Sequence, residues 1–227
     1  RDRSPSRGLG DVYKRQIQGA YDSRGGASGA LGLPTTDENQ LKGGASQSFQ
    51  GGQIHWSPST GAHVDRGAIQ AYWAQRGWEK GWLGYPTGDE ITGLASGGAS
   101  QTFQGGTLFW DARTGAVHEV HGGVLGTYGR HGYESGRLGY PTTDEIRLRG
   151  GVSQVFNNGE IHWSPSTGAH ATYGAIQDYW QRNGWQDGWL GYPTGEETPT
   201  SDGGVRQSFQ HGEVTWYRDR PLKAVRR

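Results

Sequence analysis

Two segments of the sequence bring aromatic rings and carboxylates together at short spacing. They read GWEKGWLGYPTGDE (residues 77–90) and GWQDGWLGYPTGEE (residues 184–197), and each offers two tryptophans, a tyrosine and an acidic pair. Flat aromatic faces stack on the C–H faces of sugar rings, and carboxylates accept hydrogen bonds from sugar hydroxyls. The pattern therefore predicts a carbohydrate-binding surface on each of these loops.

The candidate ligand-binding residues are the aromatic and first acidic residues of these segments and of a related one between them. They are Trp78, Trp82, Tyr85, Asp89, Tyr133, Tyr140, Asp144, Trp185, Trp189, Tyr192 and Glu196. A fourth related segment has Gly26 and Ala30 at the two tryptophan positions and is expected to be a poor site. Two alternatives stay open. Any one ring can instead pack between neighbouring repeats, and the glutamate that ends each acidic pair can instead hold its loop through backbone N–H groups.

Catalysis and metal binding find little support in the same residues. A glycosidase needs two carboxylates in different environments, which equivalent copies do not provide. The sequence has no GxSxG, Walker or HExxH motif. His55 and His63, and likewise His162 and His170, flank an SPSTG turn and are expected on adjacent strands, but two nitrogens do not complete a zinc site. We therefore expect no enzyme activity, no cofactor and no metal.

The composition restricts the partners. The chain has 42 glycines, ten tryptophans, eleven tyrosines and a hydrophobic content of only 31%, so aromatic rings must form much of the core. Its 22 basic and 22 acidic residues cancel, which argues against nucleic acid as a partner. No apolar run approaches the roughly 20 residues that cross a bilayer, so no membrane insertion is expected. Cysteine is absent, which excludes disulfides.

The candidate loops belong to a repeat. LGLPTTDE from Leu31 returns as LGYPTGDE, LGYPTTDE and LGYPTGEE from Leu83, Leu138 and Leu190, at steps of 52, 55 and 52 residues. Upstream of each copy, an apolar residue and an aromatic residue four positions later, such as Ile17 and Tyr21, predict one face of a short helix that ends at a glycine. Downstream, a Gly-Gly pair leads into an alternating segment with a glycine-rich turn, which predicts a hairpin, and a further short strand follows.

The predicted fold is an α+β repeat protein of four tandem units, each a short helix and a small three-stranded antiparallel meander. The units are residues 17–66, 67–121, 122–173 and 174–227, called repeats 1 to 4 below. Because neither end shows a polar capping repeat, a closed or nearly closed ring with pseudo-rotational symmetry is favoured over an open solenoid. Residues 1–16 match nothing in the repeat and are expected to be a disordered or foreign tail.

The Leu-Gly-aromatic-Pro motif at this spacing, with its upstream helix and downstream hairpin, resembles the LGFP repeat family. The resemblance covers nearly the whole chain, although Leu33 takes the aromatic position in repeat 1. It implies a secreted or cell-wall-associated protein, because similar repeats are appended to actinobacterial mycolyltransferases and peptidoglycan-cleaving enzymes and are thought to anchor them to arabinogalactan or related wall glycan. We therefore predict a non-catalytic, multivalent, lectin-like module for cell-wall or other extracellular polysaccharide. The alternative is a structural or protein-interaction scaffold without a glycan ligand, which gains support if Trp82 and Trp189 are buried.

Overall fold

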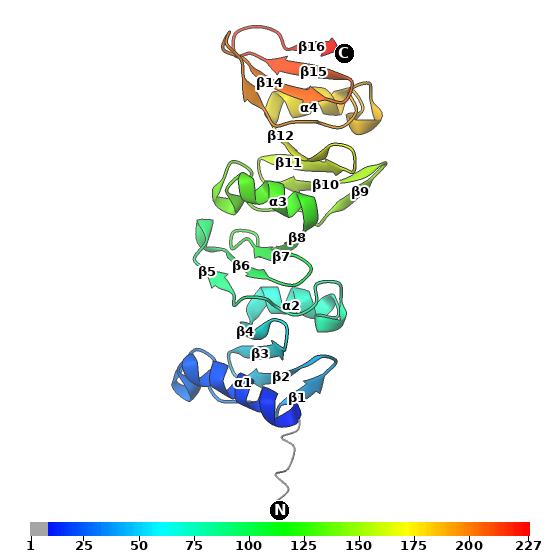
Figure 1. Cartoon of the computed structure of the whole chain (residues 1–227). Helices are drawn as coiled ribbons and strands as arrows, with labels where there is room; N and C mark the ends of the chain where they lie inside the picture. Colours follow the sequence, from blue (N-terminus) through cyan, green and yellow to red (C-terminus); the bar gives the residue numbers. More distant parts are fainter. Residues whose placement is uncertain (1–8) are drawn as a thin grey trace, which may run out of the picture. The chain divides into compact units, whose positions relative to one another are not determined.

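The computed structural model describes residues 9–227, which divide into two compact units. The first unit ends at Val117 and the second begins at His118. Repeats 1 and 2 form the first unit apart from residues 118–121, and repeats 3 and 4 lie in the second (Figure 1). Each unit is described by itself below.

One α-helix opens each repeat, as the sequence predicts. The helices are α1 (Leu9–Ser23), α2 (Gly67–Gln75), α3 (Gly122–Arg130) and α4 (Gly174–Arg182). In α1 the predicted pair Ile17 and Tyr21 is buried, and Gly25 follows with a left-handed φ of 90°. One-turn 3-10 helices come next, at η1 (Gly26–Ser28), η2 (Trp78–Lys80), η4 (Tyr133–Ser135) and η5 (Trp185–Asp187). Glycine ends each α-helix because it adopts the left-handed conformation at little cost.

Four antiparallel strands follow each helix, so the prediction of three strands is wrong. The sheets are β1–β4 (Asn39–Leu41, Gly44–Phe49, Gly52–Ser57, Gly61–Asp65), β5–β8 (Ile91–Thr92, Ala99–Thr102, Thr107–Trp110, Val117–Val120), β9–β12 (Ile146–Leu148, Gly151–Phe156, Gly159–Ser164, Gly168–Thr172) and β13–β16 (Thr198–Pro199, Val205–Phe209, Gly212–Trp216, Lys223–Arg226). The extra strand precedes the Gly-Gly pair. That pair forms a hairpin turn, with Gly43 at φ 82° and Leu41 opposite Gly44.

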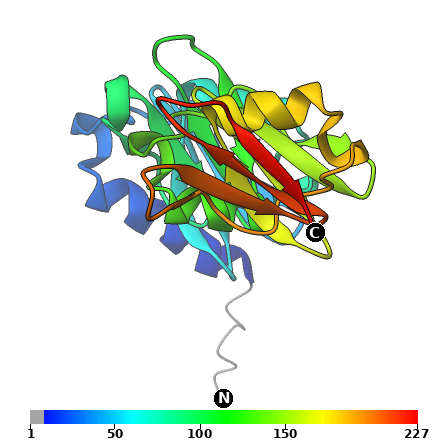
Figure 2. The ribbon, with the colours of Figure 1, turned by 90° about the horizontal axis from the view of Figure 1, so that it is seen from above.

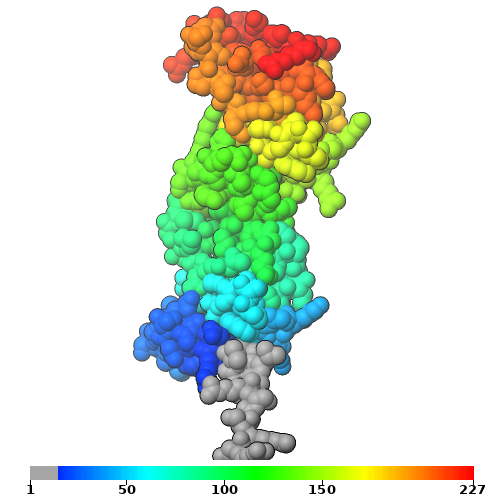
Figure 3. Space-filling view, in the orientation of Figure 1, coloured from blue at the N-terminus to red at the C-terminus, as the bar shows by residue number. Residues whose placement is uncertain are grey.

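Each helix packs on the sheet of its own repeat. In repeat 4, Ile176 and Trp180 of α4 contact Phe209 and Val214 of the sheet, and Figure 2 shows α4 (yellow) beside those strands (orange to red). Repeats 1 and 2 also lie in direct contact with one another, as the blue-to-cyan and the turquoise-to-green atoms of Figure 3 show, and the Gln101 side chain donates to the Val64 carbonyl across that contact. A helix of nine residues and one small sheet therefore gain part of their burial from a neighbour.

Two expectations about the ends and the assembly have different outcomes. The first eight residues of the predicted tail lie outside the described residues, and the part from Leu9 onward forms the beginning of α1. Over residues 9–227 the strands form four separate sheets of which none closes on itself, and a ring is not confirmed.

Within the same range, no helix combines the length and apolar character that a membrane span requires.

Candidate binding loops and the contacts between repeats

The first tryptophan of each candidate loop packs between repeats. Trp78 meets Trp73 edge-on at 5.1 Å between ring centroids and stacks on His55 of repeat 1 at 5.5 Å. Trp185 lies in the same way on Trp180 and on His162 of repeat 3, at 5.1 and 5.5 Å. These half-buried rings join neighbouring repeats, so their predicted role in ligand binding stays a prediction.

In repeat 2 the second tryptophan of the loop is the more accessible one. Trp82 keeps 46% of its surface exposed, and its ring lies over Gly105, where a Cβ would come within 2.9 Å of the indole. Trp189 lies over Gly212 in the equivalent way and is half-buried, because the Arg226 guanidinium stands 5.0 Å from its ring centroid. Glycine at these two hairpin turns thus makes room for an indole that lies on the surface.

In repeat 3 the corresponding loop carries a single aromatic ring between the helix and the LG motif. Tyr133 is 45% exposed and meets Tyr128 edge-on at 5.5 Å. Gly129 lies beneath its hydroxyl, where a Cβ would be 2.9 Å from the oxygen. An exposed aromatic residue is thus present in this repeat as well.

The tyrosines of the LGYP motif are buried rather than exposed on the loops, and Tyr85 and Tyr192 contact the preceding repeat. Tyr85, Tyr140 and Tyr192 all belong to the core. The Tyr85 hydroxyl donates to the Lys42 carbonyl of repeat 1 at 3.2 Å, and the Tyr192 hydroxyl donates to the Arg149 carbonyl of repeat 3 at 2.9 Å. Burial raises the pKa of Tyr85 to about 12. The structure gives Tyr85 and Tyr192 a packing role next to the Gly-Gly turn of the preceding repeat.

The first acidic residue of each pair bonds to the preceding repeat. Asp89 accepts hydrogen bonds from the Arg24 guanidinium, from the Val64 amide at 3.0 Å and from His63 Nδ1 at 3.3 Å. Glu196 likewise lies 3.0 Å from His131 Nε2 and 3.1 Å from His170 Nδ1, and it accepts from the Ala171 amide at 3.2 Å.

Asp144 lies 3.0 Å from His118 Nδ1 and accepts from the Glu119 amide at 3.4 Å. Part of the hydrogen-bonding capacity of all three carboxylates is therefore used inside the protein. Their contact with a sugar stays a prediction.

These contacts shift the ionisation of both partners. Burial would raise the pKa of Asp89, but the hydrogen bonds from His63 and Arg24 outweigh it and hold that pKa well below its usual range. The pKa of Glu196 is lowered in the same way, mainly by His170 against the opposing effect of burial. The hydrogen bonds to Asp89 and Glu196 raise the pKa of His63 and of His170. The repeat contacts are thus partly ionic.

The second acidic residue of each pair contacts a basic side chain. Glu90 accepts from Arg66 Nε at 3.2 Å, Glu197 from Arg137 Nη1 at 2.7 Å, and Glu145 lies 3.7 Å from His121 Nε2. The alternative of a loop held through backbone N–H groups is not what the Glu90 and Glu197 contacts show. The guanidinium groups provide the partners instead.

A buried glutamine adds a contact that the sequence analysis missed. The side-chain amide of Gln101 donates to the Val64 carbonyl of repeat 1 at 2.9 Å and to the Gly88 carbonyl of its own loop at 3.0 Å. Gln154 and Gln207 make the same pair of bonds in repeats 3 and 4. In repeat 1, the Gln47 side chain donates to the Thr36 carbonyl of its own loop and, within the described part of the chain, to no second carbonyl. Recurrence of a polar residue at an inward strand position was the signal available in the sequence.

The histidine pairs lie across adjacent strands, as predicted. His55 is opposite His63 in the β3–β4 ladder, and His162 is opposite His170 in the β11–β12 ladder. His55 Nδ1 lies 2.6 Å from the buried Asp65 carboxylate, whereas His63 faces Asp89. Among the residues that the structure describes, no group of three or more histidines, cysteines or carboxylates is placed to hold a metal ion.

The chain was compared with solved structures, with curated proteins and with models of protein families. Similar solved structures include two of the extracellular domain of BT4673 from B. thetaiotaomicron, described as a one component system and as a hybrid two component system. They share 14% and 10% identity over 87% and 86% of this chain, at TM-scores of 0.20 and 0.18, and the chain spans 25% and 23% of their lengths. A likeness at such TM-scores carries no argument. None of the curated proteins matches.

The model of the LGFP repeat matches residues 31–81, 83–136, 138–188 and 190–226. Each match begins at the leucine of an LG motif, so the family's unit is shifted along the chain relative to the repeats defined above, whose boundaries stay a prediction. Because four consecutive matches span most of the sequence, the chain belongs to the LGFP repeat family.

Proposed function

We propose that this chain is a non-catalytic module that binds cell-wall or other extracellular polysaccharide through its exposed loop aromatics. The observation that carries the proposal is the exposure of Trp82, whose indole lies next to the glycine turn at Gly105. An aromatic ring of this size on the surface offers a platform for the C–H face of a sugar. A location outside the cell or in the cell wall is part of the same proposal, consistent with the family.

Several sites on one chain suit a polymer better than a free sugar. Trp82 and Tyr133 are exposed, and Trp189 offers a half-buried ring beside Arg226. Stacking on one ring contributes about 0.5–1.5 kcal/mol beyond area burial, so each site alone binds weakly. Sites that engage the same polymer raise each other's effective concentration, which converts weak contacts into retention.

Retention on an insoluble matrix tests the proposal. The parent and the variants Trp82→Ala, Trp189→Ala and the double variant would be run over bacterial cell-wall polysaccharide, with cellulose and chitin as comparison matrices. Each single change is expected to weaken retention about 2- to 12-fold, and the double change to weaken it by more than the product.

Leu33→Ala is the matched control, because it removes an exposed apolar side chain that lies outside the tryptophan loops. Its retention should equal that of the parent. A double tryptophan variant that stays folded by circular dichroism and is retained like the parent would refute the loop platform. A parent that no matrix retains would leave the scaffold function as the better account.

A further inference from the structure

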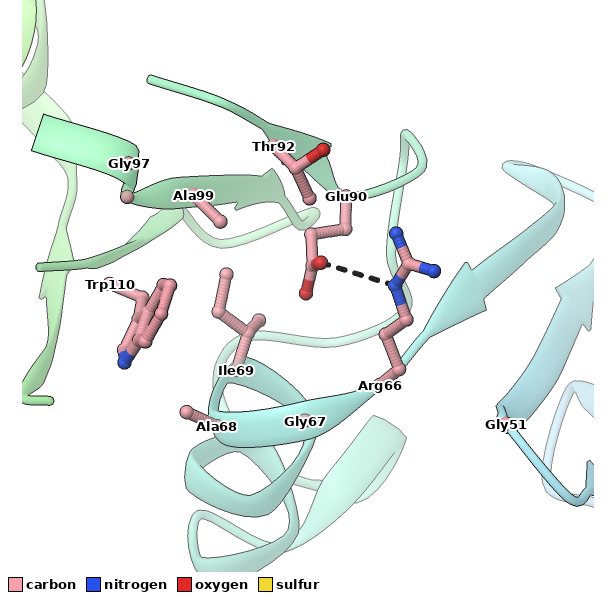
Figure 4. Close-up of a pocket in the computed structure, with 11 residues that line it drawn as sticks. Gly51, Arg66, Gly67, Ala68, Ile69, Glu90, Thr92, Gly97, Ala99 and Trp110 are labelled. Carbon is pink, nitrogen blue, oxygen red and sulfur yellow. Dashed lines mark hydrogen bonds and ion pairs between the residues drawn. The ribbon is translucent and has the colours of Figure 1, made fainter. Parts of the chain in front are cut away.

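A pocket of about 390 Å³ lies at the start of α2, between the last residue of the 77–90 loop, Glu90, and the indole of Trp110. Its walls include Arg66, Gly67 and Ala68 at the start of α2, Ile69, Glu90 and the indole of Trp110. In Figure 4 the indole and the Glu90 carboxylate stand on opposite sides of the space above Ile69. The volume falls in the range of small-molecule sites, which are mostly apolar with a few placed polar groups.

The same pocket recurs in the other compact unit. At the start of α4 it measures about 280 Å³ and is lined by Arg137 and Tyr173 of repeat 3 and by Ala175, Ile176, Glu197 and Trp216 of repeat 4. Both pockets have an alanine in the first turn of the helix, an isoleucine, a glutamate and the tryptophan that ends a strand. The arginine partner of the glutamate differs in origin: Arg66 caps the N-terminus of α2, whereas Arg137 comes from the LG loop of repeat 3 and Tyr173 caps α4. Trp216 is 38% exposed, so its indole is open to solvent. Each of the two units thus builds a pocket with an indole on one side and a glutamate–arginine pair on the other.

The polar side of each pocket has unused hydrogen-bonding capacity. The Glu90 side chain is only 11% exposed, and among residues 9–227 its one hydrogen-bonding partner is Arg66, through Oε1 and Nε. Within residues 9–227, its second oxygen and the two terminal nitrogens of Arg66 have no partner. Glu197 is 12% exposed and is held by Arg137 alone among the described residues. A carboxylate this enclosed is stabilised by any ligand that donates a hydrogen bond to it.

The chemistry of the pocket selects a class of ligand. An acceptor and donors side by side match the adjacent hydroxyls of a sugar, which donate to the carboxylate and accept from the guanidinium. The opposing indole matches the C–H face of the ring. The ion pair has no net charge, so neither an anionic nor a cationic ligand is favoured over a neutral one.

Repeat 3 shows how the pocket can be filled from within. Gly123 stands where repeats 2 and 4 have Ala68 and Ala175, and a Cβ at Gly123 would lie 2.7 Å from Trp163 Cδ1. The Trp163 indole therefore lies directly against the start of α3. In repeats 2 and 4 the alanine methyl group occupies that position, and the indole forms a wall of the pocket instead.

We infer that the Trp110 and Trp216 pockets are binding sites for a single residue of a neutral saccharide, held between the indole and the glutamate–arginine pair. These sites do not include the Trp82 and Trp189 rings, although Glu90 and Glu197 end the two loops that carry those rings. If the protein binds polysaccharide as proposed, the pockets add contacts to individual sugar residues of that polymer. If polysaccharide binding is refuted, the pockets are still expected to bind a soluble sugar.

Fluorine NMR of the full chain labelled with 5-fluorotryptophan tests the inference. Ten tryptophans give separate reporters, which Trp→Phe variants assign. The probes are the methyl glycosides of galactose, glucose and arabinofuranose, with galacturonate and glucosamine as charged counterparts. Neutral glycosides are expected to shift the Trp110 and Trp216 signals saturably, and the charged sugars are expected to shift them less.

Glu90→Gln and Glu197→Gln keep the shape and the bond to arginine but weaken the acceptor. Each should lower the affinity at its own tryptophan about tenfold and leave the other pocket unchanged. Asp178→Asn, at an exposed carboxylate on α4, is the control and should change neither signal. Unaltered affinity in both glutamine variants would overturn the assignment.

Three results would count against the pockets in different ways. Saturable shifts at Trp82 and Trp189 alone would support the loop platform and refute this inference. Shifts at Trp110 and Trp216 with hexanol but with no glycoside would show an apolar site and refute the sugar. If neither the Trp110 nor the Trp216 signal shifts with any glycoside up to its solubility limit, the inference is also refuted. Matrix retention of the parent is measured separately, so the two proposals can fail independently.

Discussion

His170 Nδ1 lies 3.1 Å from the Glu196 carboxylate, while its Nε2 lies 2.9 Å from the Thr167 carbonyl oxygen. Both partners are acceptors, so both ring nitrogens must carry a proton for the two bonds to form. His63 is placed in the same way between Asp89 and the Thr60 carbonyl. The contact between neighbouring repeats within each unit therefore includes an imidazolium ion.

This arrangement predicts a pH dependence of stability. The raised pKa of His63 and His170 contributes stability below about pH 6.5, which is lost as the pH rises through the folded-state value. The lowered pKa of Asp89 and Glu196 contributes stability above about pH 4, which is lost as the pH falls through their folded-state values. The contribution is greatest between these limits. Raising the pH from 6 to 9 should lower the Tm by about 2–4 °C for each kcal/mol lost.

Calorimetry of the double variant His63→Gln/His170→Gln checks this dependence. Its Tm should be lower than that of the parent at pH 6, and the two should converge at pH 9. His211→Gln removes an exposed imidazole from outside these contacts and should keep the parent's profile. A double variant with the parent's full slope would show that other groups set the pH dependence.

The buried glutamine that bonds to the preceding repeat predicts that the same substitution costs more stability at Gln207 than at Gln47. Gln207 is fully buried, and its amide donates to two carbonyl oxygens, so Gln207→Glu would place a carboxylate against two acceptors. The free energy of unfolding should fall by about 3 kcal/mol or more, measured by urea denaturation. Gln47→Glu is the matched change in repeat 1, where one such bond is made, and should cost less than half as much. Equal losses would contradict the role assigned to the contact with the preceding repeat.

Removal of one hydroxyl group tests the tyrosine contact. Tyr192→Phe keeps the buried ring and deletes the bond to the Arg149 carbonyl, so the free energy of unfolding should fall by about 0.5–1.5 kcal/mol. Tyr179→Phe, in the same repeat but with no hydrogen bond from its hydroxyl among the described residues, provides the reference and should be nearly neutral. A larger loss for Tyr179→Phe would place the energetic contact elsewhere.

The left-handed backbone at the first loop tryptophan predicts that glycine is more stable than alanine at this position. Trp185 has a left-handed φ of 54°, the conformation that Gly26 adopts in repeat 1. Trp185→Gly and Trp185→Ala both delete the ring that packs on Trp180, but only alanine keeps the steric cost of that backbone. The glycine variant should therefore be the more stable by about 1 kcal/mol, although glycine normally destabilises. Urea denaturation of both variants decides, and a more stable alanine variant would be inconsistent with this conformation.

Much of the architecture follows from local pattern. The spacing of Ile17, Tyr21 and Gly25 predicts where the helix lies and ends, and the alternating segment before Trp56 predicts a hairpin. Both depend on residues within a few positions of each other, which periodicity and glycine placement describe well. The fourth strand was not predicted because Asn39–Leu41 is three residues long and shows no alternation of apolar and polar residues.

The site depended on contacts that local pattern does not contain. Asp89 meets His63 and Arg24 from 26 and 65 positions away, and only packing of one repeat on the next brings them together. The sequence also offers two equivalent tryptophans in each loop. Which ring is exposed was decided by the sheet of the preceding repeat, because His55 covers Trp78 whereas Trp82 lies over a glycine turn. The Trp110 pocket also depends on tertiary packing. Ala68 at the start of α2 has a methyl group where Gly123 of α3 has none, and in repeat 3 the indole of Trp163 lies against that glycine.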